Sequence, residues 1–383
     1  MSDTYPVVKV AAVQAASVFL DREVSTEKAC LLIVEAGGQG ARVIVFPEGF
    51  IPAHPVWYHH HAATGPAAHK LAVELFKNSL DVPGPQTEAL CAAARAANAY
   101  VVIGVCEKQP NSMGTLFNSQ LYIGPDGSII RKHQKIMPTG GERIVHMGGW
   151  GDTLGVFPTE FGPMSGLICG ENSNPLAIFT LTAEGTRVHA MSWPCYLGSR
   201  GGSLHRRVAI DSQAFAQMSK SFVVSACGVI DDDLVRKLSI GAEEEKRLRE
   251  PGRCGGSLIV APDGNVLAGP LGSEEGILYA ECDLEICTSM KLRHDFAGHY
   301  NRADIFHLEV NRVPPQIFTA QAASQAGTGS PRGMGAMAAP PGTASLKTYL
   351  SPASQPLSEA GSPREFKNDD GEANPQPRRR TGS

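Results

Sequence analysis

The sequence is short of features that mark several large classes of protein. No apolar run reaches the roughly 20 residues that a membrane-spanning helix requires. The 34 Lys and Arg nearly balance the 38 Asp and Glu, so the clustered positive charge that nucleic acid or an anionic membrane demands is lacking. The opening, MSDTYPVVKV, has no signal-peptide pattern. We expect a cytoplasmic protein that acts on a small molecule, with no nucleic acid and no membrane as partner.

Paired cysteine motifs are also lacking. The nine cysteines are an odd number without a C-x-x-C pair, at positions 30, 91, 106, 169, 195, 227, 254, 282 and 287. Such a set argues against a disulfide framework and against a structural zinc site. Most of these thiols are expected to be small buried hydrophobes, so a functional cysteine has to be argued from its own surroundings.

What is present is the composition of a globular domain followed by a different tail. Apolar residues make up 42% of the 383 residues, enough for a chain of this length to bury a real core. After Val313-Pro314-Pro315 the sequence is rich in Gly, Pro, Ala and Ser, and it has too few large apolar side chains to offset the entropy of ordering. We predict a catalytic domain over residues 1–315 and a disordered tail over 316–383.

Strand-like and helix-like stretches alternate through the predicted domain. Short apolar runs bounded by turn residues predict strands at 8–16, 42–48, 100–107, 165–171, 188–194 and 221–227. Helical patterns predict helices at 23–35, 85–97, 175–183 and 206–218. Two Pro-Asp-Gly turns, in LFNSQLYIGPDGSIIRKHQK and GGSLIVAPDGNVLAGPL, predict antiparallel hairpins. This mixture favours an α/β fold with a two-layer sheet core flanked by helices over a purely parallel sheet.

A cysteine lies where a predicted strand gives way to a predicted helix. Cys169 follows the apolar run 165–168, and the helix is expected to open at Pro175. A nucleophile at such a turn is accessible to substrate, and nearby backbone N–H groups with the helix terminus stabilise a thiolate. For Cys169 considered alone, a buried structural thiol is the alternative.

Two charged segments stand at the ends of other predicted strands. Glu48 follows Pro47 in VIVFPEGFIP, and apolar neighbours are expected to raise its pKa, which suits a general base or acid; a solvated loop glutamate is the alternative. In RKHQKIMPTGGER, Lys132 and Lys135 point to different faces, so an interior lysine with a negative partner is expected; a polar edge strand is the alternative. The turn that follows delivers Glu142.

Together the three segments resemble the signature segments of the nitrilase superfamily. VIVFPEGFIPAHPVW, RKHQKIMPTGGERIVHMGGWGDTL and GLICGENSNPLA supply Glu, Lys and Cys in that order. VKVAAVQAA, MSWPCY, CGGSLIVAPDGNVL and DFAGHYNRADIF look like the same family, so the likeness covers about residues 7–312. The resemblance implies an α-β-β-α sandwich fold.

The resemblance also implies a role for each residue. It makes Cys169 the nucleophile, Glu48 the general base and acid, Lys135 the electrostatic stabiliser and Glu142 the carboxylate that orients Lys135. It implies hydrolysis of an organic nitrile to the carboxylic acid and ammonia, with some amide, and it needs neither metal nor cofactor. Related nitrilases assemble into dimers and often into spiral filaments, so a homo-oligomer is expected.

The residues after the cysteine distinguish branches of the family. Amidases and carbamoyl hydrolases usually carry an aromatic-Pro-Glu ending there, whereas Glu171-Asn172 is similar to true nitrilases. Gly170 departs from the nitrilase pattern, in which tryptophan most often follows the cysteine. The room left by the missing indole predicts a preference for arylacetonitriles or other sizeable nitriles, with Trp57 and Trp193 as apolar walls or as core residues.

Three other interpretations stay open. An amidase or carbamoyl hydrolase uses the same catalytic groups, and a catalytically silent member could be retained for assembly. His59-His60-His61 with nearby His54 raise a metal site. We disfavour it because consecutive residues rarely direct three imidazoles at one ion, and no carboxylate lies at useful spacing.

Overall fold

The computed structural model of this chain describes residues 3–196, 203–238, 240–314 and 318. The contacts group Met1–Thr319 into one compact unit. The predicted tail from 316 lies outside the described residues apart from Phe318, so its boundary and its disorder stay predictions. Within the described residues, every helix falls short of the length and apolarity that crossing a membrane demands.

Strands and helices alternate along the chain. The strands are β1 (Val7–Gln14), β2 (Val43–Val45), β3 (Tyr100–Lys108), β4 (Leu116–Ile123), β5 (Ile129–Gln134), β6 (His146–Met147), β7 (Met164–Ile168), β8 (Val188–Trp193), β9 (Phe222–Cys227), β10 (Leu258–Val260), β11 (Val266–Ala268) and β12 (Gly276–Asp283). The α-helices are α1 (Arg22–Gly38), α2 (Pro66–Asn78), α3 (Pro85–Ala97), α4 (Pro175–Ala183), α5 (Leu204–Ser219), α6 (Asp232–Leu238), α7 (Ala242–Leu248) and α8 (Glu285–Lys291). Short 3-10 helices are η1 (Val56–His59), η2 (Gly140–Ile144), η3 (Gly151–Thr153) and η4 (Cys169–Ser173).

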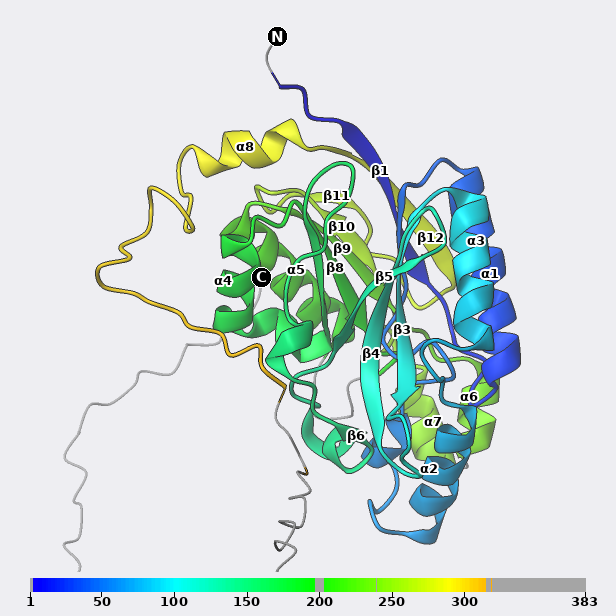
Figure 1. Ribbon diagram of the computed structural model, residues 1–383. Helices are drawn as coiled ribbons and strands as arrows, with labels where there is room; N and C mark the ends of the chain where they lie inside the picture. Colours follow the sequence, from blue (N-terminus) through cyan, green and yellow to red (C-terminus); the bar gives the residue numbers. More distant parts are fainter. Residues whose placement is uncertain (1–2, 197–202, 239, 315–317, 319–383) are drawn as a thin grey trace, which may run out of the picture. The chain divides into compact units, whose positions relative to one another are not determined.

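The described strands form two sheets. One has the order β12-β1-β2-β3-β4-β5, with β6 beside β4, and the other has the order β11-β10-β9-β8-β7. β1, β2 and β3 are parallel, as are β7, β8 and β9, whereas both predicted hairpins are antiparallel. Parallel neighbours need a helical crossover, and tight turns suffice for antiparallel ones. In Figure 1, α1 and α3 cover the outer side of the first sheet, and α4 and α5 cover the outer side of the second.

Side-chain alternation along the strands separates three apolar layers. On β1, Val8 and Val10 pack in the same cluster as Phe222 and Val224 of β9, so this cluster lies between the sheets. Alternate residues of β1 pack instead with α1 and α3, and alternate residues of β9 pack with α4 and α5. Successive side chains of a strand point to opposite faces of its sheet, and here one face packs against the other sheet while the opposite face packs against helices. The result is an α-β-β-α sandwich. The predicted fold is confirmed.

The sequence patterns predict many of these elements but not all of them, and helices α2, α6, α7 and α8 are missing from the prediction. α3 and α4 have the predicted bounds. The strand predicted at 165–171 ends at Ile168, because the chain leaves the sheet at Cys169. Strand β12 is missing from the prediction, and it pairs with β1 along its whole length, from Val7 opposite Asp283 to Gln14 opposite Gly276. Its side chains are mostly half-buried, so pairing with β1 rather than local pattern defines it.

We predict that truncating a side chain in the layer between the sheets destabilises the protein strongly. Phe222 is fully buried there, so Phe222→Ala is expected to lower the free energy of unfolding by about 3–5 kcal/mol. Leu31→Ala on the exposed side of α1 is the matched control, and chemical denaturation of both variants is the measurement. Equal stability losses in the two variants would contradict this layered core.

Candidate active site

A lysine ammonium lies between two buried carboxylates at one end of the sandwich. Lys135 Nζ is 2.8 Å from Glu48 Oε1 and 2.7 Å from Glu142 Oε2. All three side chains are removed from solvent. Ions of opposite sign are stable in such a place only when they are paired and hydrogen-bonded, as these are. The structure thus brings together three of the four predicted site residues by direct contact.

Glu48 is positioned by the backbones of both sheets. It follows β2 by three residues, and its N–H donates to the carbonyl of Trp193, at the end of β8, over 3.1 Å. Strand β3 comes equally close, because a Cβ at Gly104 would lie 2.8 Å from the Cα of Glu48 and 2.6 Å from the amide nitrogen of Gly49. A side chain at position 104 would therefore displace the carboxylate. Only the missing side chain of Gly104 permits this approach.

Lys135 and Glu142 are joined by a short turn after β5. The Lys135 N–H donates to the carbonyl of Asn118 on β4 over 2.8 Å, which extends the sheet ladder past the end of β5. Gly140 then adopts a positive φ of 57°, and the N–H of Thr139 donates to Glu142 Oε2 over 2.9 Å. The predicted turn at 138–141 therefore places Glu142 against Lys135. Lys132, on β5, pairs instead with the buried carboxylate of Glu107 and is about one-third exposed.

One amide connects the two carboxylates and is not among the predicted site residues. Asn118 Nδ2 donates to Glu48 Oε1 and to Glu142 Oε1, each over 2.7 Å. His146 adds a further contact to Glu142 Oε1, from Nδ1 at 3.2 Å. The sequence does contain a signal for Asn118, because this polar residue lies inside the strand-like run LFNSQLYI, and a polar side chain on a buried strand needs a hydrogen-bond partner.

Cys169 lies at a strained turn between β7 and α4. Its φ is +52°, a left-handed conformation that non-glycine residues rarely adopt and that often marks functional sites. The Asn172 side chain holds this turn by donating to the Cys169 carbonyl over 2.9 Å, and it accepts a hydrogen bond from His189 Nε2 at the same distance. The predicted strand-to-helix turn is therefore present. The thiol is buried in the sandwich rather than open to bulk solvent.

Glu171 connects the cysteine turn to the lysine segment. Its Oε1 accepts from the N–H of Ile136, adjacent to Lys135, over 2.6 Å. Its Oε2 accepts from the N–H of Ile168, adjacent to Cys169, over 3.0 Å. One carboxylate thus fixes the backbone beside both Lys135 and Cys169. From the sequence, Glu171 was taken only as a mark of the nitrilase branch.

The charges of the cluster set the protonation of its members. Burial raises the pKa of Glu48, although Lys135 opposes this rise. Burial also opposes the charge of Lys135, but the nearby Glu48 carboxylate, Cys169 and Glu142 raise its pKa well above the ordinary value. Burial opposes ionisation of Glu142 as well, yet Lys135 holds its pKa well below the usual range. The expected rise in the pKa of Glu48 is confirmed in direction.

The cysteine departs from expectation in its charge. Lys135 and the Gly170 N–H lower the pKa of the Cys169 thiol, as predicted, but burial and the Glu48 carboxylate outweigh them and raise it well above the ordinary value. A resting thiolate stabilised by the turn and the lysine is therefore the wrong description of this site. Burial, together with the negative charge of Glu48, favours the protonated thiol. A thiol with a raised pKa needs a base nearby if it is to act as a nucleophile.

The histidines do not converge as a metal site of their own. His60 Nδ1 is 3.1 Å from Glu244 of α7, His61 Nε2 is 2.9 Å from the Leu238 carbonyl, and His59 packs against Tyr58. These three imidazoles therefore point toward different partners, which agrees with the reason for disfavouring a metal.

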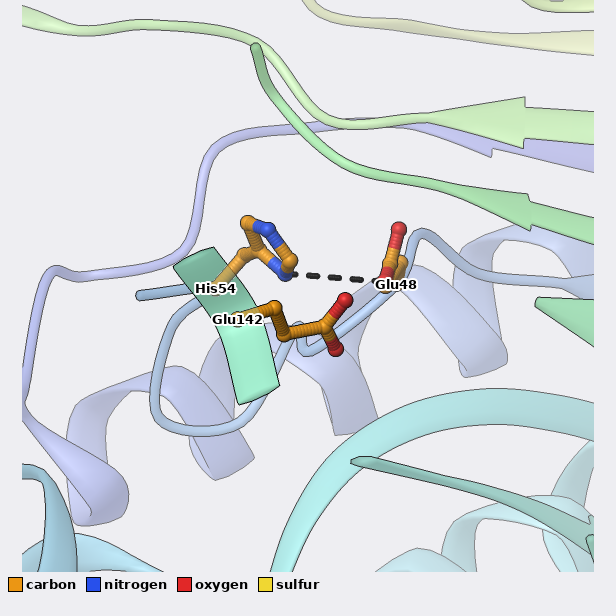
Figure 2. Close-up of side chains that lie close together, drawn as sticks. All are labelled: Glu48, His54 and Glu142. Atoms are coloured by element: carbon orange, nitrogen blue, oxygen red, sulfur yellow. Dashed lines mark ion pairs between the residues drawn. The ribbon is translucent and has the colours of Figure 1, made fainter. Parts of the chain in front are cut away.

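His54, in contrast, lies beside two carboxylates, those of Glu48 and Glu142. Ligand atoms of Glu48, His54 and Glu142 lie within 4.8 Å of one another, which corrects the expectation that no carboxylate is near (Figure 2). Lys135 already supplies the positive charge between the two carboxylates.

Position 170 has room for a Cβ atom. Among the described residues, a Cβ added at Gly170 would meet only Thr139 Oγ1, at 3.7 Å, which is an ordinary van der Waals contact. Trp57 and Trp193 are both fully buried and belong to apolar clusters of the core. Of the two roles considered for these tryptophans, burial favours the core.

This arrangement agrees with comparisons to known proteins. Residues 9–292 match the carbon-nitrogen hydrolase family, and the chain belongs to this family of enzymes that hydrolyse carbon–nitrogen bonds. The chain is 35% identical over 299 residues to "Nitrilase 2" of an unknown prokaryotic organism, covering 78% of this chain and 91% of the relative. It is 34% identical over 317 residues to an "Aliphatic nitrilase" of Rhodococcus rhodochrous, covering 79% and 82%.

Solved structures with low sequence identity have the same fold. The NitFhit protein of C. elegans matches with a TM-score of 0.62 at 18% identity, covering 82% of this chain and 70% of that protein. Nit3 of Saccharomyces cerevisiae, a member of branch 10 of the nitrilase superfamily, matches with a TM-score of 0.59 at 20% identity, covering 80% and 99%. The predicted family and the sandwich fold are both confirmed.

We predict that Asn118→Ala impairs turnover more than folding. The variant removes two hydrogen bonds to charged groups, and a loss in the transition state equivalent to one of them, about 1.5–3 kcal/mol, should lower kcat roughly 10- to 150-fold. The acidic limb of kcat/KM should move to higher pH, because Asn118 favours the ionised form of Glu48.

The matched control is Ser119→Ala. Ser119 is the next residue on β4, and it donates to a different buried carboxylate, Glu107, over 2.6 Å. This variant should lose stability but keep its pH profile. A wild-type kcat in Asn118→Ala would show that Asn118 does not contribute to turnover.

Proposed function

We propose that this chain is a nitrilase, which hydrolyses an organic nitrile to the carboxylic acid and ammonia. The observation that carries the proposal is the buried Glu48–Lys135–Glu142 cluster, tied through Glu171 to the turn that bears Cys169. The names of the relatives support a nitrile as the substrate. Because the nucleophile has to stay a free thiol, and all nine cysteines are unpaired, we place the enzyme in the reducing cytosol.

The first half of the reaction forms a covalent bond to sulfur. Glu48 takes the thiol proton as Cys169 Sγ bonds to the nitrile carbon, and it then gives the proton to the nitrile nitrogen, which yields a thioimidate. A raised pKa suits this exchange, because Glu48 has to return the proton that it accepts. Because Glu48 removes the proton while the sulfur attacks, no thiolate has to accumulate first, so the raised pKa of the thiol does not prevent the reaction.

The second half releases the two products. A water molecule gives a proton to Glu48 and adds to the thioimidate carbon, and the negative charge that develops lies in the field of Lys135. Glu48 passes this proton to the nitrogen, and the hydroxyl proton follows as the carbon–nitrogen bond breaks, which releases ammonia and leaves a thioester on Cys169. A second water then breaks the carbon–sulfur bond to give the acid and restore the thiol. If the carbon–sulfur bond of the tetrahedral intermediate breaks first, the product is the amide.

We predict that the three reactive groups act as a unit. Cys169→Ala should abolish turnover because no covalent intermediate can form, and Glu48→Gln and Lys135→Ala should each lower kcat by about a hundred-fold or more. Cys30→Ala, at a half-buried cysteine of α1, serves as the control and should keep wild-type kcat. Ammonia release measures all four. More than trace turnover by folded Cys169→Ala would overturn the mechanism.

We further propose that Gly170 widens the site for sizeable nitriles. The open space at its Cβ position supports this role, because an indole there would occupy volume beside the nucleophile. Wild type should prefer phenylacetonitrile over acetonitrile, and Gly170→Trp should lower kcat/KM for phenylacetonitrile more than for acetonitrile.

A nitrile panel with ammonia, acid and amide quantified is the measurement. Best activity on small aliphatic nitriles, or an unchanged profile in Gly170→Trp, would contradict the role of Gly170. Phenylacetamide belongs in the same panel, because a faster release of ammonia from the amide than from phenylacetonitrile would favour the amidase alternative.

We also propose that the chain assembles into a homo-oligomer through α4 and α5. Leu176 on α4 and Ile210 on α5 are each more than half exposed. A groove of about 700 Å³ with mainly apolar lining lies between these helices and the segment from Phe296 to Leu308. Exposed apolar surface of this kind is typical of faces that a second subunit covers.

Sedimentation should therefore give a mass of at least twice 40.6 kDa. Ile210→Glu should shift the protein toward the monomer, because it buries a charge in the interface, whereas Val34→Glu on exposed α1 should not. A wild-type monomer at micromolar concentration would contradict the proposed assembly.

A further inference from the structure

The carboxylate of Glu48 has one oxygen that the site leaves without a partner. Oε1 receives Lys135 and Asn118, but Oε2 is buried and has no hydrogen-bond partner among the described residues. His54 Nδ1 is buried and unpartnered in the same way. This nitrogen faces Glu48 at 3.6 Å from Oε1, which is too long for a direct hydrogen bond (Figure 2).

A small cavity lies beside these two groups. Its volume is about 10 Å³, which is close to the least space that one water molecule requires. Four of the residues that line it, Ser17, Glu48, His54 and Cys195, have polar or ionisable side chains, and the other lining residues are apolar or glycine. Buried waters occupy sites of this size that offer two to four polar partners.

The ring of His54 is held in place from its other side. His54 Nε2 lies 3.1 Å from the Tyr58 hydroxyl, and burial lowers the pKa of His54 to about 3. The imidazole is therefore neutral at working pH, so it is not a cationic partner for Glu48. A neutral nitrogen that faces a carboxylate across more than a hydrogen-bond length is the setting in which a bridging water is expected.

We propose that this cavity binds one water molecule, which bridges Glu48 Oε2 and His54 Nδ1 and thereby completes the hydrogen bonding of the catalytic carboxylate. The inference rests on the proposed role of Glu48. Cys169 is not among the described residues that line the cavity, so this water is separate from the water that attacks the thioimidate. By donating to Oε2 it stabilises the ionised form of Glu48, and His54 is a positioning residue that acts through it.

The pH dependence of Glu48 has several contributors besides this water. The charged and titratable groups that act on it or face it are Lys135, Glu142, His54, Tyr58, Cys106, Cys169 and Cys195. Lys135 and Glu142 stay charged and the others stay neutral across the working range. A change made at His54 that leaves these groups in place therefore reports on the bridge.

A high-resolution crystal structure of the full chain is the first test. It should contain an ordered water within about 2.6–3.2 Å of both Oε2 and Nδ1. A cavity without water density would overturn the proposal, whatever the enzyme's substrate proves to be.

Substitutions at His54 give the second test. His54→Phe removes the nitrogen and should move the acidic limb of kcat/KM upward by about one pH unit, as loss of one hydrogen bond to a charged group implies. His54→Asn keeps a polar atom near the position of Nδ1 and should retain most of the wild-type profile.

The control is His60→Phe, at a histidine of the same segment that does not line the cavity, which should leave the acidic limb unchanged. An unchanged limb in folded His54→Phe, or equal shifts in the Phe and Asn variants, would overturn the proposal. A wild type without hydrolase activity would instead overturn the proposed function and leave the water site standing on the crystal structure.

Discussion

The ammonium of Lys135, held between the carboxylates of Glu48 and Glu142, is the interaction on which the rest of the site depends. Each charge alone would be too costly to bury, and removing one partner from such a cluster typically destabilises a protein by about 3–5 kcal/mol. The cluster therefore requires that segments from three places in the chain meet. The strand ends after β2 and β5, and the amide of Asn118 on β4, converge at this cluster, where all the side chains involved are buried.

Burial and the negative charge of Glu48 both favour the protonated form of the Cys169 thiol, and Lys135 offsets only part of this effect on its pKa. In the proposed mechanism Glu48 removes the thiol proton as the sulfur attacks the substrate, so no buried thiolate forms without an electrophile beside it. Lys135 and Asn118 both donate to Glu48 Oε1, and each donor helps to keep this carboxylate ionised and in place.

Much of this could be read from the sequence because local pattern and local structure agree. The bounds of α3 and α4, both hairpins and the turn that carries Glu142 follow from residues near one another in the chain. What the pattern could not give depends on contacts between distant segments. β12 is defined by pairing with β1, Asn118 by two carboxylates on other segments, and the place of His54 by its approach to Glu142 as well as to nearby Glu48. The charge state of Cys169 is likewise a sum over buried neighbours, which no single motif encodes.

The central claim is that catalysis proceeds through a covalent bond between the substrate carbon and Cys169. Rapid acid quench of the wild-type enzyme during turnover of an arylacetonitrile, followed by intact-mass measurement and peptide mapping, tests it most directly. We predict one adduct per chain, with the mass of the thioimidate or the acyl group, on the peptide that contains Cys169 and on none of the peptides with the other cysteines. Turnover without an adduct on Cys169, or an adduct on a different cysteine, would contradict the account.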